Sequence, residues 1–171
     1  MTATRITAAN PQNAEPIRKS VTVPLSPAEA FDLFVTRMDT WWPLAEKSVS
    51  AGRDIRPSQT LRVEPGVGGR IVEEMADGTE ALWGEILDWE PGARFRMTWV
   101  PGRAAEMPTE VDVTFTRVGP DCRVDLTHSG FEAHASGTEA RAMYDGGWHL
   151  LIGTVYAKAA KLASHPMAIA E

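Results

Sequence analysis

A long helical pattern near the C-terminal end constrains the fold of this chain more than any other feature. Apolar residues recur there at intervals of three or four: Ala140, Tyr144, Trp148, Leu151, Val155, Ala159 and Leu162. This spacing predicts a continuous apolar stripe on a helix roughly 40 Å long, at 1.5 Å per residue. We expect the capping box that starts at Ser136 to begin the helix and His165-Pro166 to end it. A stripe of this length is buried only if the helix lies across a sheet.

A series of short strand patterns precedes this helix. Three of them alternate apolar and polar residues, and their apolar faces carry Phe95, Met97 and Trp99, then Val111, Val113 and Phe115, then Cys122, Val124, Leu126 and His128. Burial of one face only is typical of an antiparallel sheet with its other face in water. The predicted strands span 17–25, 60–63, 70–75, 80–89, 94–99, 110–117 and 123–128. Asp77-Gly78 gives the strongest hairpin signal.

A short helix is predicted between the first two strands. Ser26-Pro27-Ala28-Glu29 is a capping box with proline at the first helical position. Pro43 ends any helix at or before Trp42, and we expect an irregular loop over 44–59. The order of elements is therefore strand, short helix, six strands and long helix, which indicates an α+β domain with a curved antiparallel sheet.

Length and composition favour one soluble, cytoplasmic domain. The 171 residues suit a single domain, which we expect at 17–165 between a flexible tail (1–16) and a short tail (166–171). Cys122 is the only cysteine, so no intrachain disulfide can form. The longest uncharged apolar stretch, 146–157, has twelve residues and is too short to cross a bilayer. The net charge of −6 disfavours binding to a phosphate backbone.

Several motifs, in order along the chain, resemble the START-like, or SRPBCC, helix-grip superfamily. Residues 23–31 (VPLSPAEAF) are similar to its opening. Three stretches more narrowly resemble the branch named after activators of a heat-shock chaperone's ATPase: 68–71, then 83–86 through Pro91 to 98–99, then 126–131 followed by 147–148. The resemblance implies a seven-stranded sheet that grips the C-terminal helix, two short helices after the first strand, and a cavity under the long helix. Its members include lipid carriers, polyketide cyclases, sequestering proteins, stress-response proteins and chaperone activators.

Aromatic residues are the main candidates for the wall of such a cavity. The chain has six tryptophans, and each needs a large apolar space and a partner for its indole N–H. We predict a cavity lined by Trp83, Met97, Trp99, Tyr144 and Trp148, with His128 near its edge. Phe131 and Leu151 are further candidates for ligand binding. Trp41 and Trp42, beside Pro43, form either a gate or a packed surface corner. Gly146 and Gly147 suggest close approach of the sheet or of a ligand to the helix.

The polar candidates are His128, Glu73 and Glu85, and each has a structural and a functional interpretation. His128 is either a strand-end histidine bonded to a backbone carbonyl, which we favour, or an acid–base group. Glu73 and Glu85 either point inward and mark a polar site, or turn outward into water, the simpler interpretation. A metal site at His128 and His134 would match no known ligand spacing, so we expect no metal and no organic cofactor.

Three functions follow from these observations. The first is binding or sequestration of a small hydrophobic, aromatic or lipid-like molecule. The second is a cyclase or hydratase that uses His128 as acid and base. The third is a regulator that contacts a chaperone through its surface. We expect a small hydrophobic ligand or a chaperone as partner, no nucleic acid and no membrane insertion, and a monomer or homodimer.

Overall fold

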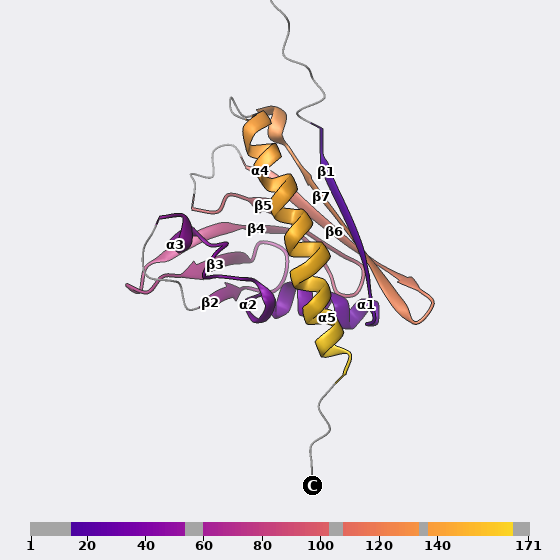
Figure 1. Ribbon diagram of the computed structural model, residues 1–171. Helices are drawn as coiled ribbons and strands as arrows, with labels where there is room; N and C mark the ends of the chain where they lie inside the picture. Colours follow the sequence, from indigo (N-terminus) through magenta and orange to yellow (C-terminus); the bar gives the residue numbers. More distant parts are fainter. Residues whose placement is uncertain (1–14, 54–59, 103–107, 134–136, 166–171) are drawn as a thin grey trace, which may run out of the picture.

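The computed structural model describes residues 15–53, 60–102, 108–133 and 137–165. In these ranges seven antiparallel strands form one curved sheet in the order β1-β7-β6-β5-β4-β3-β2 (Figure 1). The strands are β1 (Ile17–Val23), β2 (Thr60–Val63), β3 (Arg70–Glu74), β4 (Glu80–Glu90), β5 (Arg94–Trp99), β6 (Thr109–Val118) and β7 (Asp121–Ser129). The predicted α+β fold is confirmed, including the sheet that curves around a long C-terminal helix. The two expected tails fall mainly on residues outside the described ranges.

Turn residues set the order of the strands. Every strand from β2 to β6 pairs with the next one in the sequence, and β1 forms the other edge of the sheet by pairing with β7. The predicted hairpin at Asp77-Gly78 joins β3 to β4, and Gly78 has a φ of 86°, which glycine adopts without strain. The amide of Gly78 donates to the carbonyl of Met75 over 3.0 Å. The glycine therefore closes this turn.

Short helices follow β1, as predicted. The first is α1 (Pro27–Phe31), where the hydroxyl of Ser26 accepts from the amide of Glu29 and the carboxylate of Glu29 accepts from the amide of Ser26. The π-helical turn η2 (Asp32–Thr36) and α2 (Met38–Trp41) continue the segment. The loop predicted at 44–59 is wrong in part, because α3 (Val49–Gly52) lies within it.

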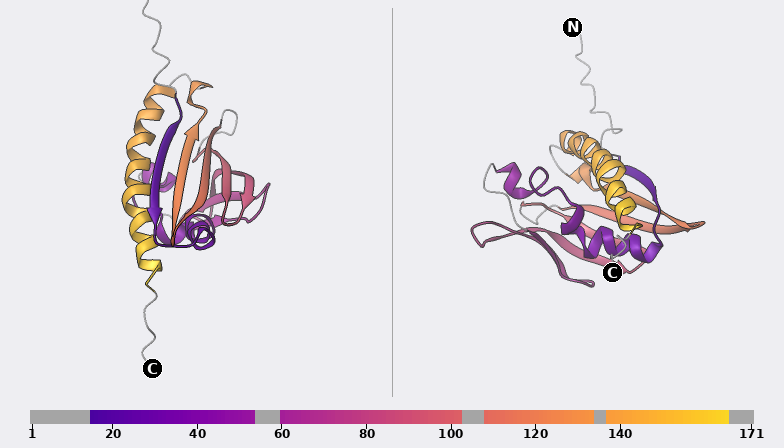
Figure 2. Two further views of the ribbon diagram at one scale, coloured as in Figure 1. Left: turned by 90° about the vertical axis from the view of Figure 1, so that its right-hand side faces the viewer. Right: turned by 60° about the horizontal axis from the view of Figure 1, so that its bottom comes forward.

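The long C-terminal helix consists of three segments. They are α4 (Gly137–Leu150), the π-helical η4 (Leu151–Tyr156) and α5 (Ala157–Ala163), preceded by the single turn η3 (Phe131–Ala133). Figure 2 shows this helix running along one side of the curved sheet, beside β1. The capping residue predicted at Ser136 lies outside the described residues.

The predicted apolar stripe of this helix is correct as far as Ala159 and wrong at Leu162. Trp148 and Leu151 are buried, and Tyr144 and Val155 are half-buried. Beyond them Tyr156 and Ala160 face the core, whereas Leu162 is 67% exposed. The cause is η4, because a π turn holds more residues than an α turn and so rotates the following residues around the helix axis.

The glycine pair in α4 does not mark a close approach to the sheet. A Cβ placed on Gly146 or on Gly147 would meet no heavy atom within 4 Å, apart from the neighbouring helix backbone. The interpretation that the sheet crowds these positions is therefore wrong. Gly147 instead faces open space at one wall of a pocket.

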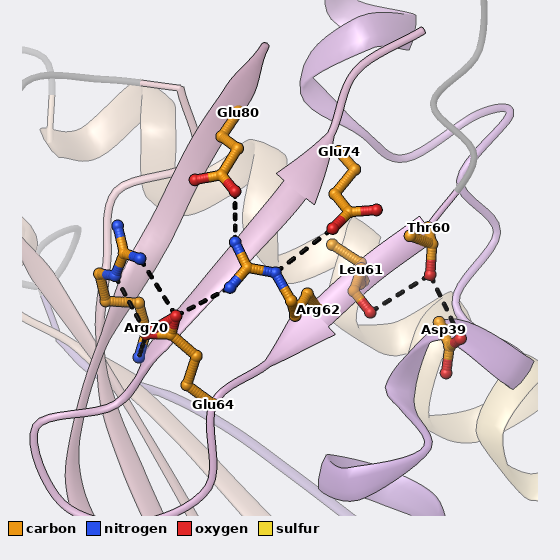
Figure 3. A network of polar contacts seen from close by, with 8 residues as sticks. All are labelled: Asp39, Thr60, Leu61, Arg62, Glu64, Arg70, Glu74 and Glu80. Atoms are coloured by element: carbon orange, nitrogen blue, oxygen red, sulfur yellow. Dashed lines mark hydrogen bonds and ion pairs between the residues drawn. The ribbon is translucent and has the colours of Figure 1, made fainter. Parts of the chain in front are cut away.

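Charged side chains cover the sheet surface around β2, β3 and β4. The guanidinium of Arg62 lies between the carboxylates of Glu64, Glu74 and Glu80, and Arg70 pairs with Glu64 (Figure 3). These side chains are all partly exposed, so water screens each pair and the pairs contribute little to stability. This network is a solvated face of the sheet in which the cations are already paired.

Candidate ligand pocket

A pocket of about 420 Å³ lies between the α3 segment, the sheet and α4. Its aromatic lining residues are Trp42, Trp83, Trp99, Tyr144 and Trp148. Its other lining residues are Glu46, Lys47, Ser48, Val49, Gly52, Arg53, Pro101, Gly102, Met143, Gly147 and Leu151. The pocket therefore has an aromatic wall and a partly polar rim supplied by residues 46–53.

Four tryptophans of the pocket wall form a closed ring of contacts with one another. Successive ring centroids are 5.0 Å apart for Trp42 and Trp83, 5.6 Å for Trp83 and Trp99, 5.3 Å for Trp99 and Trp148, and 5.9 Å for Trp148 and Trp42. All four contacts are edge-on or tilted, the arrangements that aromatic quadrupoles favour. These residues come from different parts of the chain, and their packing against one another holds the wall together.

The indole N–H groups of this ring are satisfied in three cases. Trp42 donates to the carbonyl of Lys47, Trp83 donates to Glu73 over 2.9 Å, and Trp148 donates to His128 over 2.9 Å. The Nε1–H of Trp99 is buried and has no hydrogen-bond partner among the described residues. A buried donor without an acceptor is costly, so the indole N–H of Trp99 lowers the stability of the wall.

His128 lies behind this wall, completely buried. Its Nδ1 accepts from the indole of Trp148, because an indole nitrogen can only donate. Its Nε2 is 2.7 Å from the hydroxyl of Thr109, which is itself 3.2 Å from the carbonyl of Trp99. The assignment that fits these contacts puts the ring proton on Nε2. The chain of hydrogen bonds then runs from the indole of Trp148 through His128 and Thr109 to the carbonyl of Trp99. These two contacts of His128 are with side chains, whereas the favoured interpretation named a backbone carbonyl.

Glu73 is a buried carboxylate at the other side of the pocket. It accepts from the amides of Val49 and Ser50 at 2.8 and 3.0 Å, from the hydroxyl of Ser50, and from the indole of Trp83. Several donors to one carboxylate offset the cost of burying its charge. Glu73 therefore ties α3 to the sheet and to the wall residue Trp83. The interpretation that favoured an outward Glu73 is wrong.

The rim carries two cations close to the pocket opening. Lys47 and Arg53 both line the pocket, and neither has a carboxylate within 4 Å among the described residues. Nη2 of Arg53 donates to the carbonyl of Gly102 over 3.3 Å. Glu46 is the acidic residue of the same rim.

The structure distributes the predicted ligand residues over two layers. Those that line the pocket are Trp42, Trp83, Trp99, Tyr144, Trp148 and Leu151. Those that lie behind it or elsewhere are Trp41, Glu73, Glu85, Met97, His128 and Phe131. Glu85 is exposed, in agreement with its simpler interpretation, and Trp41 packs on Trp42 and Tyr156. Binding by any of these residues stays a prediction.

Sequence reasoning missed the rim and the polar partners behind the wall. Lys47, Val49 and Arg53 fall in a segment that was expected to be an irregular loop, and they carry no motif. Thr109 and Ser50 are buried partners of His128 and Glu73. These pairs are separated by 19 and 23 residues, so no local pattern could reveal them.

Groups for metal binding or nucleophilic chemistry are scarce in the described part of the chain. No three His, Cys, Asp or Glu side chains of residues 15–53, 60–102, 108–133 and 137–165 lie close enough to share a metal ion. His134, one of the two histidines of the conceivable metal site, lies outside those ranges. Burial raises the pKa of the Cys122 thiol, which makes it a poorer nucleophile. None of the described helices has both the length and the apolar character needed to cross a bilayer.

The fold and the pocket define a START-like helix-grip protein. The family model described as "Activator of Hsp90 ATPase homolog 1-like protein" matches residues 24–154. The chain therefore belongs to this family, and the resemblance drawn from its motifs is confirmed. The comparison with curated proteins gives no match.

Solved structures show the same fold. An anthrahydroquino-γ-pyrone synthase, Txn09, complexed with SUM, is 33% identical, with a TM-score of 0.53 over 74% of this chain and 84% of that one. The Aha1 dimer from Colwellia psychrerythraea, solved in solution, is 16% identical, with a TM-score of 0.60 over 86% and 97%. CalU16 from Micromonospora echinospora is 16% identical, with a TM-score of 0.56 over 84% and 73%. The last two show the fold alone.

Proposed function

We propose that this protein binds a small, mostly apolar aromatic molecule in the pocket between α3 and α4. The observation that carries the proposal is a wall of four mutually packed tryptophans that lines a pocket of about 420 Å³. Pockets for small ligands usually measure about 300–1,000 Å³ and combine an apolar lining with a few polar groups. The 33% identical synthase, whose name indicates a polycyclic aromatic product, supports the same class of ligand.

The glycine pair in α4 gives a matched test. Gly147 lines the pocket, Gly146 does not, and both positions have space for a side chain. Gly147→Leu should fill the pocket, whereas Gly146→Leu should place the same side chain outside it. The probe is the uncharged dye phenylnaphthylamine, and binding is followed by its fluorescence and by the quenching of tryptophan emission.

We expect the unmodified protein and Gly146→Leu to bind the dye alike, and Gly147→Leu to bind it at least about tenfold more weakly. A tenfold change corresponds to about 1.4 kcal/mol, less than the burial of one aromatic ring contributes. No binding by the unmodified protein at micromolar concentrations would end the proposal. Equal binding by both leucine variants would place the dye elsewhere on the protein.

A cyclase-type reaction on such a ligand is the second candidate, favoured by the identity to the synthase. His128, the predicted acid–base group, lies behind Trp148 and does not line the pocket. Its direct action would require the Trp148 indole to move. Incubation with the substrate of the synthase, followed by mass spectrometry, tests this candidate, and His128→Gln should then abolish product formation but keep dye binding.

Three further expectations stay predictions. A chaperone partner and a role in stress response are supported by the name of the family. A homodimer is supported by the dimer described for the Colwellia relative. The cytoplasmic location is supported by the single cysteine. Sedimentation velocity of the purified protein would decide between monomer and homodimer.

A further inference from the structure

We infer that the ligand of this pocket is an aromatic acid, with its planar body against the tryptophans and its anionic group at the rim beside Arg53 and Lys47. This inference rests on the proposed function and adds the charge of the ligand to it. The anionic group can be a carboxylate, a sulfonate or an ionised phenol, because all three offer oxygens to a cation.

The first argument is the state of the rim cations. Some arginines of the sheet are paired with carboxylates, such as Arg94 with Asp112 at 2.6 Å and Arg96 with Asp88 at 2.6 Å, whereas the exposed Arg117 has no such pair among the described residues. Lys47 and Arg53 have no such partner in the described part of the chain. Two cations without a carboxylate partner among the described residues, beside an apolar pocket, attract an anion, although the chain as a whole carries a formal charge of −6.

The second argument is the placement of Arg53. One N–H of its guanidinium donates to the carbonyl of Gly102, which lies on the opposite lip of the pocket. Gly102 has a φ of 64°, and a Cβ there would lie 2.7 Å from Val49 and 3.4 Å from the guanidinium. The absence of a side chain therefore lets Arg53 lie against this turn. A guanidinium has five N–H groups, so donors are left for a ligand oxygen.

The third argument is the anchoring of the segment that carries both cations. Lys47 and Arg53 flank α3, a helix of only four residues that would not be stable by itself. The buried carboxylate of Glu73 holds the amides of Val49 and Ser50. Flexible side chains of the rim thus project from a fixed backbone, which reduces the entropy lost when they engage a ligand.

The test compares two dyes that share one aromatic body. Anilinonaphthalene sulfonate carries a sulfonate that phenylnaphthylamine lacks. Both are titrated into the unmodified protein, Arg53→Gln, Lys47→Gln and the control Arg117→Gln, whose arginine is exposed on β6 and does not line the pocket. Circular dichroism and urea unfolding confirm that each variant is folded.

We expect the unmodified protein to prefer the sulfonate dye. Arg53→Gln and Lys47→Gln should each weaken its binding about two- to tenfold, the range for partly exposed ion pairs and charged hydrogen bonds. Binding of the uncharged dye should change less than twofold, and Arg117→Gln should change neither. Higher salt should reduce the preference, because exposed charges are screened.

The outcomes separate this inference from the function on which it rests. If neither dye binds, the proposed function fails. If the uncharged dye binds as tightly as the sulfonate dye, or if Arg53→Gln weakens both equally, the pocket remains and the anionic ligand is overturned. The inference is also overturned if Gly147→Leu still binds the sulfonate dye, because that dye then lies outside the pocket.

Discussion

The indole of Trp148 donates a hydrogen bond of 2.9 Å to Nδ1 of His128 and so joins the pocket wall on α4 to strand β7. Both side chains are buried, and the other ring nitrogen of His128 is held by Thr109 at 2.7 Å. The position of Trp148 is therefore set by a polar contact as well as by packing. His128 therefore helps to position Trp148 in the pocket wall.

Removal of this contact should be costly in each single variant, and the cost of the double variant should be smaller than the sum of the two single costs. We expect His128→Leu to lower the free energy of unfolding by about 2–4 kcal/mol, because the buried donor of Trp148 loses its acceptor. Trp148→Phe should cost a similar amount. The double variant should cost less than the sum by about 0.5–3 kcal/mol, as measured by urea unfolding. Strict additivity would show that the bond contributes nothing.

Glu73→Gln should loosen the rim of the pocket. Both carboxylate oxygens of Glu73 accept two hydrogen bonds, and the glutamine amide would place donors against donors at one of them. We expect a loss of about 2–4 kcal/mol in stability and faster hydrogen exchange at the amides of Val49 and Ser50. Glu85→Gln, an exposed glutamate on the neighbouring strand, is the control and should change neither. Unchanged exchange in Glu73→Gln would contradict the anchoring of α3.

Alanine at either helical glycine should stabilise the protein. Because a Cβ at Gly146 or Gly147 meets no atom within 4 Å, each substitution should raise the free energy of unfolding by about 0.5–1 kcal/mol. Gly84→Ala is the opposite case, since its Cβ would lie 1.8 Å from the carbonyl oxygen of Thr98. Urea unfolding of the three variants measures the difference. Destabilisation by Gly147→Ala would mean that the helix packs more tightly than the structure shows.

Alternation along the strands was sufficient to predict the sheet. Phe95, Met97 and Trp99 are all buried on one face, as their pattern indicated. The same alternation places Glu73 on the buried face with Ile71 and Met75, and only its charge argued for an outward position. That argument failed because four donors from other elements surround the carboxylate. Sequence patterns report the local face of a residue, but not the partners that make burial of its charge tolerable.

The helix shows a second limit of sequence reasoning. A π turn adds a residue to the helix without a marker in the sequence, so the most deeply buried residues after Leu151 are not those of the predicted stripe. Tyr156 and Ala160 are fully buried there, whereas Ala159 of the stripe is only partly buried and Leu162 is exposed. The candidate pocket could be predicted only in part for a similar reason. Its aromatic residues follow a recognisable sequence pattern, whereas its rim at 46–53 follows none.

Tyr156 should make the stability of the protein sensitive to alkaline pH. Its hydroxyl is buried and donates to the carbonyl of Ala30 over 2.8 Å. Burial, and to a smaller extent the nearby Cys122, raise the pKa of Tyr156 above its ordinary value of 10.0. Below about pH 10 the phenol is protonated in both the folded and the unfolded chain, so its contribution is complete.

Above that pH the unfolded chain releases the proton and the folded protein keeps it, so the free energy of unfolding should fall by about 1.4 kcal/mol per pH unit from this group. Tyr156→Phe should lower stability by about 0.5–1.5 kcal/mol at pH 7, through the lost hydrogen bond, and should flatten the decline above pH 10. Tyr144→Phe removes the only other tyrosine of the chain and is the matched control. Urea unfolding between pH 7 and 11 measures both slopes. An equally steep decline in Tyr156→Phe would show that another group is responsible.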